Sequence, residues 1–202
     1  MAIKSEANRM ANIIRQLLDF ARRRTPQRKL VDLHHVASQC VELLRSLATK
    51  HNIELVVSGN QSLTANVDAD QIQQVLTNLV VNAIQAMPDG GTVSIDLTQV
   101  RAQPPGATDA NEEAYCCISI SDEGVGINDD DRQHLFEPFF TTKDVGEGTG
   151  LGLSVSYGIV QDHDGWIDVQ SEKGCGSRFT VFLPQPTEDN TTDVRPAAEH
   201  EA

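Results

Sequence analysis

Four glycines at positions 146, 148, 150 and 152 alternate with other residues and lead directly into an apolar, helix-like stretch from Ser154 to Val160. Alternating glycines leave backbone N–H groups uncovered and allow positive φ angles. The N-terminus of the helix behind them carries about half a positive charge, so the segment is suited to hold a polyphosphate. A flexible loop that ends in a helix cap would explain the run about as often. It is not a Walker A loop, since no Gly-Lys-Ser/Thr follows, and no apolar strand precedes it as in a Rossmann turn.

The length of 202 residues allows one domain and an appendage. The hydrophobic fraction of 39% is sufficient to form a core. No run approaches 18 apolar residues and we find no signal peptide, so we expect a cytoplasmic segment without membrane contact of its own, even if the complete protein is membrane-anchored. The four cysteines at 40, 116, 117 and 175 show no CxxC spacing, which favours reduced, structural thiols.

The net charge of −13 is unevenly distributed, because residues 1 to 30 carry eight Lys and Arg against Glu6 and Asp19. Such a split is typical of a junction between modules. Arg22-Arg-Arg24 has no interleaved aromatic residues and the rest of the chain is acidic, so we do not expect nucleic acid as a partner.

The first 25 residues have the pattern of one helix with an apolar seam. The seam advances in steps of 4, 3, 4, 3 and 4 residues through Ile3, Ala7, Met10, Ile14, Leu17 and Ala21. Ile13, Leu18 and Phe20 make the apolar surface wider than a two-stranded coiled coil needs. Thr25-Pro26 ends this helix, residues 26–32 form a linker, and Asp32 is the candidate N-cap of a second helix over about 33 to 50.

The remaining pattern predicts alternating strands and helices. We expect strands at Ile53 to Val57, Leu63 to Val67, Thr92 to about Val100, and 115 to 121, with a helix at 70 to 87 and a turn at 88 to 91. Residues 101 to 114 form a loop insertion. The main domain is expected over 33–184, followed by a disordered acidic tail at 185–202.

The helix at 70 to 87 carries an unusual stripe of neutral amides beside its apolar face. The stripe advances in steps of 3, 4, 4 and 3 residues through Gln71, Gln74, Asn78, Asn82 and Gln85. Solvated faces are normally built from Lys and Glu, and Asn is disfavoured inside helices. The stripe therefore suggests the wall of a ligand cleft, in which an Asn oxygen suits Mg²⁺ beside phosphates. The alternative is a hydrogen-bonded polar stripe without a ligand.

Asp122-Glu-Gly-Val-Gly126 follows an apolar strand, so its first carboxylate lies at a strand end. A carboxylate there can accept a hydrogen bond from an exocyclic amine, and the glycines let the backbone approach a flat base. A simple Asp-Gly turn would explain the segment equally well. The acidic run Asn128-Asp-Asp-Asp131 lacks EF-hand spacing and more simply caps a short helix that continues to Leu135.

Together and in this order, these segments resemble the N, G1, F and G2 boxes of the sensor histidine kinase ATP-binding domain, in the GHKL (HATPase_c) superfamily that also includes gyrase B, heat-shock chaperone ATPases and mismatch-repair ATPases. The F box is Phe136-Glu-Pro-Phe-Phe-Thr-Thr-Lys143, and Gly174-Cys-Gly-Ser-Arg-Phe179 resembles the last glycine box. The resemblance covers about 31 to 184. It implies the Bergerat-type α/β two-layer sandwich, a mixed sheet packed on helices, with an N-terminal helix that comes from a dimerisation and phosphoacceptor hairpin.

The resemblance also implies roles for individual residues. Asn82 would coordinate Mg²⁺ with Asn78 beside it, and Asp122 would bind the adenine amine. The F and G2 boxes would form a mobile lid, from which Lys143 and the backbone of 150 to 153 reach the phosphates. The residues implied to surround ATP are Asn78, Asn82, Gln85, Asp122, Gly124, Gly126, Ile127, Phe136, Thr142, Lys143, Gly148, Thr149, Gly150, Leu151, Gly152, Leu153 and Ser177.

One position distinguishes the branches of this superfamily. The ATPase branches carry Glu-x-x-x-Asn, in which the Glu activates water, whereas this chain has Asn78 at the Glu position. An amide cannot act as a general base, so transfer to another nucleophile is favoured over hydrolysis. We therefore expect a histidine kinase in which Asn78, Asn82 and Lys143 are catalytic. The alternatives are a nucleotide-dependent binding module and a slow ATPase.

None of the six histidines lies in the His-Glu context of a phosphoacceptor helix, which the resemblance places upstream of the first helix. We therefore expect that this chain does not phosphorylate itself. The implied partners are the phosphoacceptor helix of a full-length kinase and the receiver domain of a response regulator, with a homodimer in the complete protein.

Overall fold

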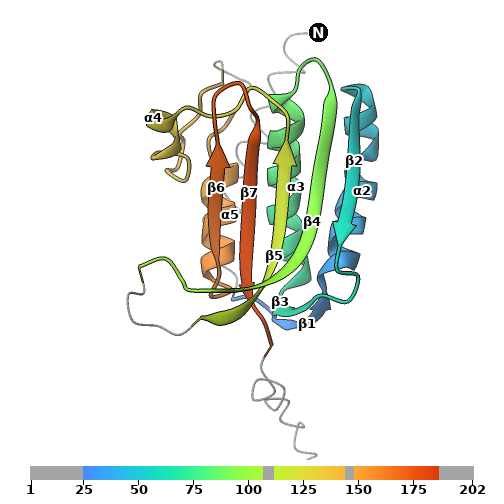
Figure 1. Cartoon of the computed structure of the whole chain (residues 1–202), viewed down its shortest axis with the longest axis vertical. Helices are drawn as coiled ribbons and strands as arrows, with labels where there is room; N and C mark the ends of the chain where they lie inside the picture. The colour runs from blue at the N-terminus through green and yellow to red at the C-terminus, as the bar shows by residue number, and fades with distance from the viewer. Residues whose placement is uncertain (1–24, 107–111, 144–147, 187–202) are drawn as a thin grey trace, which may run out of the picture.

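The computed structural model describes residues 25–106, 112–143 and 148–186. In this part of the chain a five-stranded mixed sheet lies against helices on one face only, with the sheet in front of the helices in Figure 1. This confirms the two-layer architecture expected from the resemblance. The predicted first helix over residues 1–24, the tail from residue 187 onward and residues 144–147 of the predicted lid lie outside the described residues.

The order of the strands in the sheet differs from their order along the chain. Its order is β2-β4-β5-β7-β6, with bounds Ile53–Gly59, Gly91–Ala102, Glu113–Asp122, Ser177–Pro184 and Trp166–Ser171. Strands β2 and β4 pair in parallel, and the other neighbours pair antiparallel. A separate antiparallel pair, β1 (Lys29–Asp32) and β3 (Thr64–Val67), closes the lower end in Figure 1.

The two long helices begin where the sequence provides an N-cap. Asp32 caps α2 (Leu33–Lys50) by accepting from the backbone N–H groups of His34 and His35. Asp68 caps α3 (Ala69–Ala86) by accepting from the N–H of Gln71. Asn128 caps the short α4 (Asp129–Arg132), so the predicted cap is confirmed although the helix ends three residues before Leu135.

The core lies between the sheet and α3, the central helix of that layer. Ile72, Val75 and Leu76 on α3 are completely buried. They belong to one hydrophobic cluster with inward-facing residues of the sheet such as Val93 and Ile118. Burial of one such side chain contributes about 1.5 to 3 kcal/mol, so this apolar face fixes which way the amide stripe of α3 points.

The structure corrects several sequence predictions. The expected linker contains strand β1, and the expected loop insertion is shorter because β4 extends to Ala102 and β5 begins at Glu113. Strands β6 and β7 were not predicted at all. The last helix, α5, spans Gly152–Gln161 and therefore begins inside the glycine run.

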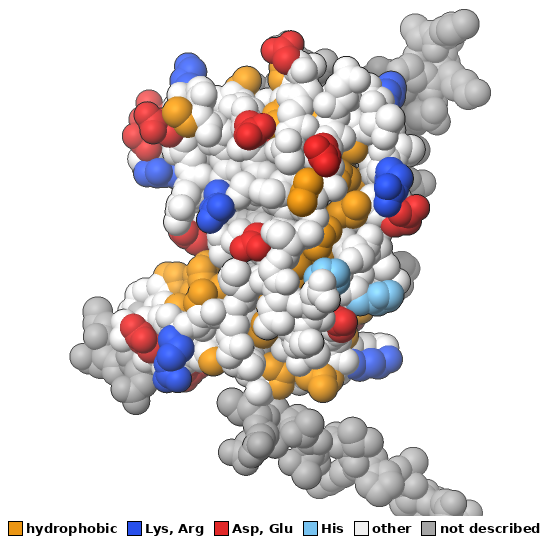
Figure 2. All heavy atoms as spheres, turned by 45° about the vertical axis from the view of Figure 1, so that its right-hand side comes forward, with side chains coloured by type: hydrophobic (Ala, Val, Ile, Leu, Met, Phe, Trp, Pro, Cys, Tyr) orange, Lys and Arg blue, Asp and Glu red, His pale blue; other side chains and the backbone are white. Residues whose placement is uncertain are grey.

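Figure 2 brings the edge formed by α2 and β2 forward and shows acidic and basic side chains interspersed over this face. A band of hydrophobic side chains crosses it. Partly buried residues of both elements, including Leu47 and Leu55, pack against the core. The helix layer therefore covers the core at this edge, and only the border of the core is exposed. No helix among the described residues has the length and apolarity needed to cross a membrane.

Candidate functional site

The amide stripe of α3 contacts the first turn of α5. The Asn78 side-chain nitrogen donates to the carbonyl oxygen of Gly152 at 3.2 Å and to the Ser156 hydroxyl oxygen at 3.2 Å. Ser156 is completely buried and donates to the same carbonyl at 2.9 Å. These three groups hold the glycine-run end of α5 against the middle of α3.

One turn further along α3, two amide oxygens face a cation. The Lys143 ammonium group donates to Oδ1 of Asn82 at 3.4 Å and to Oε1 of Gln85. Lys143 lies 61 residues after Asn82 in the sequence, so the fold brings the end of the Phe136–Lys143 segment onto the stripe. Asn78, Asn82, Gln85 and Lys143 thus lie together, as the resemblance implied.

The stripe is not one continuous wall. Gln71 and Gln74 line a separate groove of about 1160 Å³ between α3, α5 and residues 25–31. The sequence pattern treated all five amides as one surface. The structure assigns only the C-terminal three to the neighbourhood of Lys143 and the glycine run.

Asp122 is the last residue of β5 and is 9% exposed. Its Oδ1 accepts from the backbone N–H of Gly124 at 2.9 Å. Burial raises the pKa of the Asp122 carboxyl above its ordinary value, and backbone N–H donation from Gly124 and Ser177 offsets part of that rise. A buried carboxylate held in this way is a directed hydrogen-bond acceptor.

The glycines after Asp122 are required by close backbone contacts. A Cβ on Gly124 would lie 2.5 Å from the carbonyl oxygen of Ala86, and a Cβ on Gly126, which has φ +64°, would lie 2.0 Å from that of Glu172. The Val125 N–H donates to the Ala86 carbonyl at 3.1 Å. The loop therefore joins the end of α3 to the β6–β7 turn, which places Asp122 beside the amide-bearing end of α3.

Two serines hold the other side of this loop. The Ser171 hydroxyl accepts from the Ile127 N–H at 2.8 Å and lies 3.0 Å from the Ser177 hydroxyl. Ser177 pairs with Asp122 across the β5–β7 ladder. Ile127 and Ser177, both implied by the resemblance, are thus positioned next to Asp122.

The two predicted lid segments contact each other where they are described. The Phe139 N–H donates to the Gly150 carbonyl at 2.9 Å. Gly150 has φ +65°, and a Cβ there would lie 2.3 Å from the carbonyl carbon of Phe139. Phe136 packs its ring on that of Tyr157 with centroids 5.0 Å apart, which anchors the first segment on α5.

The remaining implied residues lie along the same two segments. A Cβ on Gly148 would lie 2.5 Å from the Thr141 hydroxyl, and the Thr149 hydroxyl accepts from the Leu151 N–H at 3.5 Å. Leu151 is 1% exposed, Leu153 packs partly on the core, and Thr142 makes no hydrogen bond within the described residues. These residues surround the start of α5.

The N-terminus of α5 has no side-chain cap among the described residues. The unpaired N–H groups of a first helical turn, together with the helix dipole, favour an anion. The site has a buried carboxylate at one side, amide oxygens and a lysine in the middle, and an uncapped helix N-terminus at the other side. This arrangement fits a nucleotide with its phosphates. Sequence reasoning missed Ser156 and Ser171, whose only sequence signal is a polar residue within an apolar element.

Comparison with known proteins identifies this arrangement. Residues 67–187 match the family described as histidine kinase-, DNA gyrase B- and HSP90-like ATPase. The sensor kinase CckA of Brucella abortus (strain 2308) is 41% identical over 205 aligned residues, which cover 100% of this chain and 22% of CckA. The sensor histidine kinase ZraS of Escherichia coli (strain K12) is 36% identical over 89% of this chain and 36% of its own length. The chain thus spans about a third or less of the length of these relatives.

Solved structures agree with the sequence matches. The nucleotide-free catalytic domain of histidine kinase ThkA matches with a TM-score of 0.64 and 28% identity over 79% of this chain and 98% of that domain. A structure of ThkA in complex with the response regulator protein TrrA matches with a TM-score of 0.70 and 25% identity, over 92% of this chain and 50% of that one. The chain therefore belongs to the histidine kinase-, DNA gyrase B- and HSP90-like ATPase family and, within it, to the ATP-binding catalytic domains of sensor histidine kinases.

Proposed function

We propose that this domain transfers the γ-phosphoryl group of ATP to a histidine side chain on a phosphoacceptor helix. The observation that carries the proposal is Asn78. It lies one turn before Asn82 on α3, where a hydrolytic site needs a carboxylate base, and its NH₂ group already donates to Gly152 and Ser156. An amide cannot take a proton from water at neutral pH. A neutral imidazole needs no such base, because the lone pair on its ring nitrogen can attack phosphorus directly.

ATP binds with its adenine at Asp122 and its phosphates at α5. The Asp122 carboxylate accepts from the adenine amine, because each of its oxygens has two acceptor positions and only some are used by backbone N–H groups. The backbone N–H groups of 150 to 153 point to the phosphates at the uncapped N-terminus of α5. Gly124, Gly126 and Ile127 line the adenine side, and Phe136, Thr142, Gly148 and Thr149 line the phosphate side.

The residues fit a magnesium ion held mainly by Asn82. The Asn82 and Gln85 oxygens face the positively charged Lys143 ammonium group, so this pair of acceptors is oriented toward a cation. Neutral amide oxygens are hard ligands and suit Mg²⁺ next to phosphates. When bound there, the ion supplies charge neutralisation for the phosphate oxygens.

Lys143 stabilises the charge that develops on the phosphates during transfer. In the structure its ammonium group is bound to Asn82 and Gln85, and the side chain has to exchange these acceptors for phosphate oxygens. The imidazole nitrogen forms a bond to the γ-phosphorus as the bond between that phosphorus and the bridging oxygen of ADP breaks. The positioning of these groups is what the domain contributes to the reaction.

The partners follow from this chemistry. A phosphoacceptor helix supplies the histidine, and a response-regulator receiver domain accepts the phosphoryl group from it, consistent with ThkA having been solved together with TrrA. In the complete protein the hairpin helices form a homodimer.

The chain does not phosphorylate its own histidines under this proposal. His163 is 1% exposed, with Nδ1 2.8 Å from the Ile159 carbonyl and Nε2 accepting from the Asp68 N–H. The ring of His134 is paired with Glu137 at 2.8 Å, and this hydrogen bond raises the pKa of His134. His34 and His51 lie at the two ends of α2, so neither stands in a phosphoacceptor helix context.

The test uses the chain with γ-labelled Mg-ATP and a separately supplied phosphoacceptor hairpin from a homologous sensor kinase. We expect acid-labile, base-stable label on the hairpin and none on the chain, and we expect Asn82→Ala to remove it. Release of free phosphate without labelling would assign the domain to the slow ATPases. Nucleotide binding with neither product would assign it to the binding modules, and either result overturns the proposal.

A further inference from the structure

His163 is a buried histidine that the proposed reaction does not use. It lies just after the end of α5, where the chain turns with the hydrogen bonds of a Schellman motif. The Asp164 N–H donates to the Gln161 carbonyl at 3.0 Å. The Gly165 N–H donates to the Val160 carbonyl at 3.0 Å, and Asp164 has the positive φ, +58°, of such a turn. The turn leaves Asp164 at the surface and directs the His163 ring, which is 1% exposed, into the domain.

Two backbone groups fix which nitrogen of this ring carries the proton. Nδ1 lies 2.8 Å from the carbonyl oxygen of Ile159, which can only accept, so Nδ1 is protonated. Nε2 lies 3.0 Å from the backbone nitrogen of Asp68, which can only donate, so Nε2 presents its lone pair. The neutral ring therefore joins the last turn of α5 to the N-cap residue of α3.

A doubly protonated ring does not fit this position. Its Nε2–H would face the Asp68 N–H, and two buried donors would meet without an acceptor. Burial lowers the pKa of His163 from its ordinary value of 6.5, and this is the largest effect. The hydrogen bond to Ile159 raises the pKa. The charged groups that act on the ring are Arg28 before β1, which lowers the pKa, and Asp68 and Asp162 at the ends of α3 and α5, which raise it.

Polar contacts hold α5 on α3 at two separate places. Near the first turn of α5, Asn78 donates to Gly152 and Ser156. After its last turn, His163 accepts from Asp68. Asp68 and Asn78 are ten positions apart, which is about 15 Å along a helix. Apolar packing between the helices is non-directional, whereas hydrogen bonds at two points with this spacing fix the register of one helix on the other.

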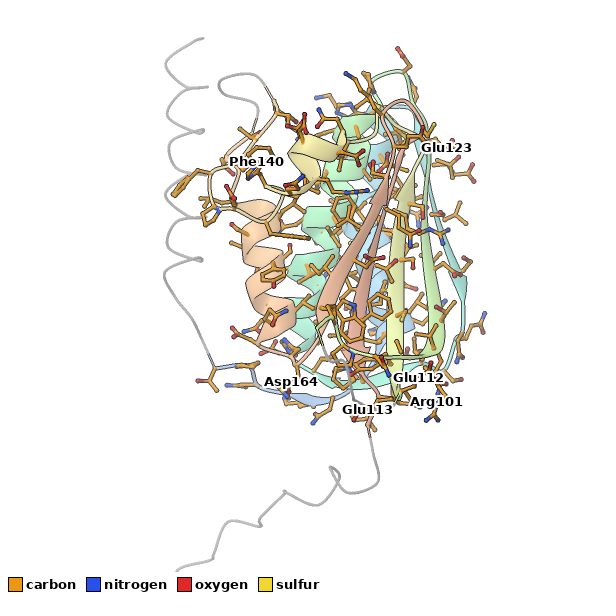
Figure 3. The ribbon with its side chains drawn as sticks, turned by 60° about the vertical axis from the view of Figure 1, so that its left-hand side comes forward. Arg101, Glu112, Glu113, Glu123, Phe140 and Asp164 are labelled. Carbon is orange, nitrogen blue, oxygen red and sulfur yellow. The ribbon has the colours of Figure 1, made fainter. Side chains whose placement is uncertain are left out.

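The His163 contact lies away from the ATP site. Figure 3 shows Asp164, the neighbour of His163, and Phe140 of the predicted lid at opposite ends of α5. A nucleotide whose phosphates bind at the first turn of α5 is therefore out of reach of His163. The ring can influence that nucleotide only through the position of the helix.

We propose that neutral His163 is a positioning residue for the phosphate-binding turn of α5, and that protonation of its ring releases the end of α5 from α3. With both contacts in place, the first turn of α5 is held where its N–H groups meet the phosphates. Without the His163 contact the helix shifts on α3, and only the fraction of molecules in the correct register binds ATP at full strength. This inference rests on the proposed function, because it takes the N-terminus of α5 as the phosphate site.

The experiment compares the full chain with His163→Gln, His163→Leu and the control His35→Gln, an exposed residue of α2. Gln places an amide oxygen near the position of Nε2 and does not titrate, so it keeps an acceptor for the Asp68 N–H at every pH. Leu keeps the position filled but has no acceptor. ATP calorimetry and denaturant unfolding without nucleotide are measured from about pH 7.5 to about pH 5. Thermal unfolding of each variant verifies that the domain remains folded.

The positioning role is tested at the neutral end of this range. His163→Leu should bind ATP at least roughly threefold more weakly than the parent, because a helix that is not held lowers the binding-competent fraction to about a third. His163→Gln should restore the affinity of the parent. Equal Kd values for the parent and His163→Leu would overturn the positioning role.

The release is tested on the acid side. The unfolded chain takes up the proton at the ordinary pKa of 6.5, whereas the folded ring stays neutral to lower pH. Relative to His163→Gln, the unfolding equilibrium constant of the parent should therefore rise by up to about tenfold per pH unit as the pH falls from 6.5 toward the lowered pKa. The ATP Kd of the parent should rise at least roughly threefold relative to His163→Gln over the same range. The control should follow the parent, and titration of the nucleotide itself affects all four proteins alike.

Parallel pH profiles in the parent and His163→Gln, in either measurement, would overturn the release. The unfolding comparison contains no nucleotide. A chain that bound no ATP at any pH would therefore contradict the proposed function, while the unfolding profiles would still decide whether protonation of His163 is linked to the fold.

Discussion

Asp122→Asn separates the binding role of this carboxyl group from its effect on stability. In the parent the carboxyl is 9% exposed and accepts from the Gly124 N–H at 2.9 Å. Asn keeps the shape and one acceptor oxygen, which can still accept from the Gly124 N–H. It replaces the second acceptor by an NH₂ donor, which faces the adenine amine with the wrong polarity.

The loss in ATP binding can be worked out from this change. A hydrogen bond to a charged group contributes about 1.5 to 3 kcal/mol, and the loss of one corresponds to a roughly ten- to hundredfold weaker Kd. The NH₂ group can instead donate to the carbonyl oxygen that guanine carries at the corresponding position. The variant should therefore lose most of its preference for ATP over GTP, as measured by calorimetry with each nucleotide.

Asp122→Asn should weaken ATP binding but stabilise the folded domain, and the gain in stability depends on pH. Because burial raises the pKa of Asp122, ionising it costs the folded state free energy at pH 7. That cost is absent below the ordinary carboxyl pKa and is fully present above the raised one. Asp122→Asn should therefore increase the free energy of unfolding at pH 7, and the gain should shrink as the pH falls through the window between the two pKa values.

The assay is denaturant unfolding at several pH values alongside the binding titration, with Asp89→Asn in the exposed α3–β4 turn as the control. The control should change neither property. Unchanged ATP affinity in Asp122→Asn would refute the adenine assignment. A less stable variant at pH 7 would refute the argument that burial dominates the energetics of this carboxyl.

Four further changes test other parts of the domain. Gly150→Ala should lower nucleotide binding and should lower the free energy of unfolding by more than about 1 kcal/mol, because its Cβ would lie 2.3 Å from Phe139 at a φ of +65°. Gly158→Ala should instead stabilise α5 by about 0.5 to 1 kcal/mol, because its Cβ would have nothing within 4 Å. Thermal unfolding measures both changes in stability. Asn82→Ala should weaken ATP binding roughly ten- to hundredfold with Mg²⁺ and much less with EDTA, by calorimetry. Lys143→Gln should slow transfer to a supplied hairpin roughly a hundredfold with a smaller change in Kd, in single-turnover labelling; equal losses in rate and affinity would show that Lys143 only binds.

The elements that sequence reasoning predicted well are those with a strong local signal. α3 combines an uninterrupted apolar face with an Asp N-cap and a Pro after its end, and the structure differs from the prediction by one residue at each end. The same holds for α2, where Asp32 caps the helix as predicted. In both helices the local pattern and the tertiary packing favour the same structure.

Three strands were missed, and one of them, β1, depends on a partner distant in sequence. Strand β1 has four residues, most of them exposed, and exists because it pairs with β3 more than 30 residues later. Strands β6 and β7 flank the last glycine box and were not predicted, although β7 alternates buried and less buried residues along its length. The division of the amide stripe was not predictable either, because it depends on where α5 crosses α3.

α5 links the two surfaces described above, because each of its ends belongs to a different one. Its first turn is held by Asn78 through Gly152 and Ser156, and it has no side-chain cap of its own. The turn that follows its last residue contains the Asp162 carbonyl and the Asp164 carboxylate, and both bind Arg28 at one end of the groove. A helix of ten residues moves as one body, so its position is set by the α3 contacts in its middle and by whatever binds at its ends. The phosphate-binding turn of the proposed function and the Arg28 contacts therefore belong to one helix and the turn that follows it.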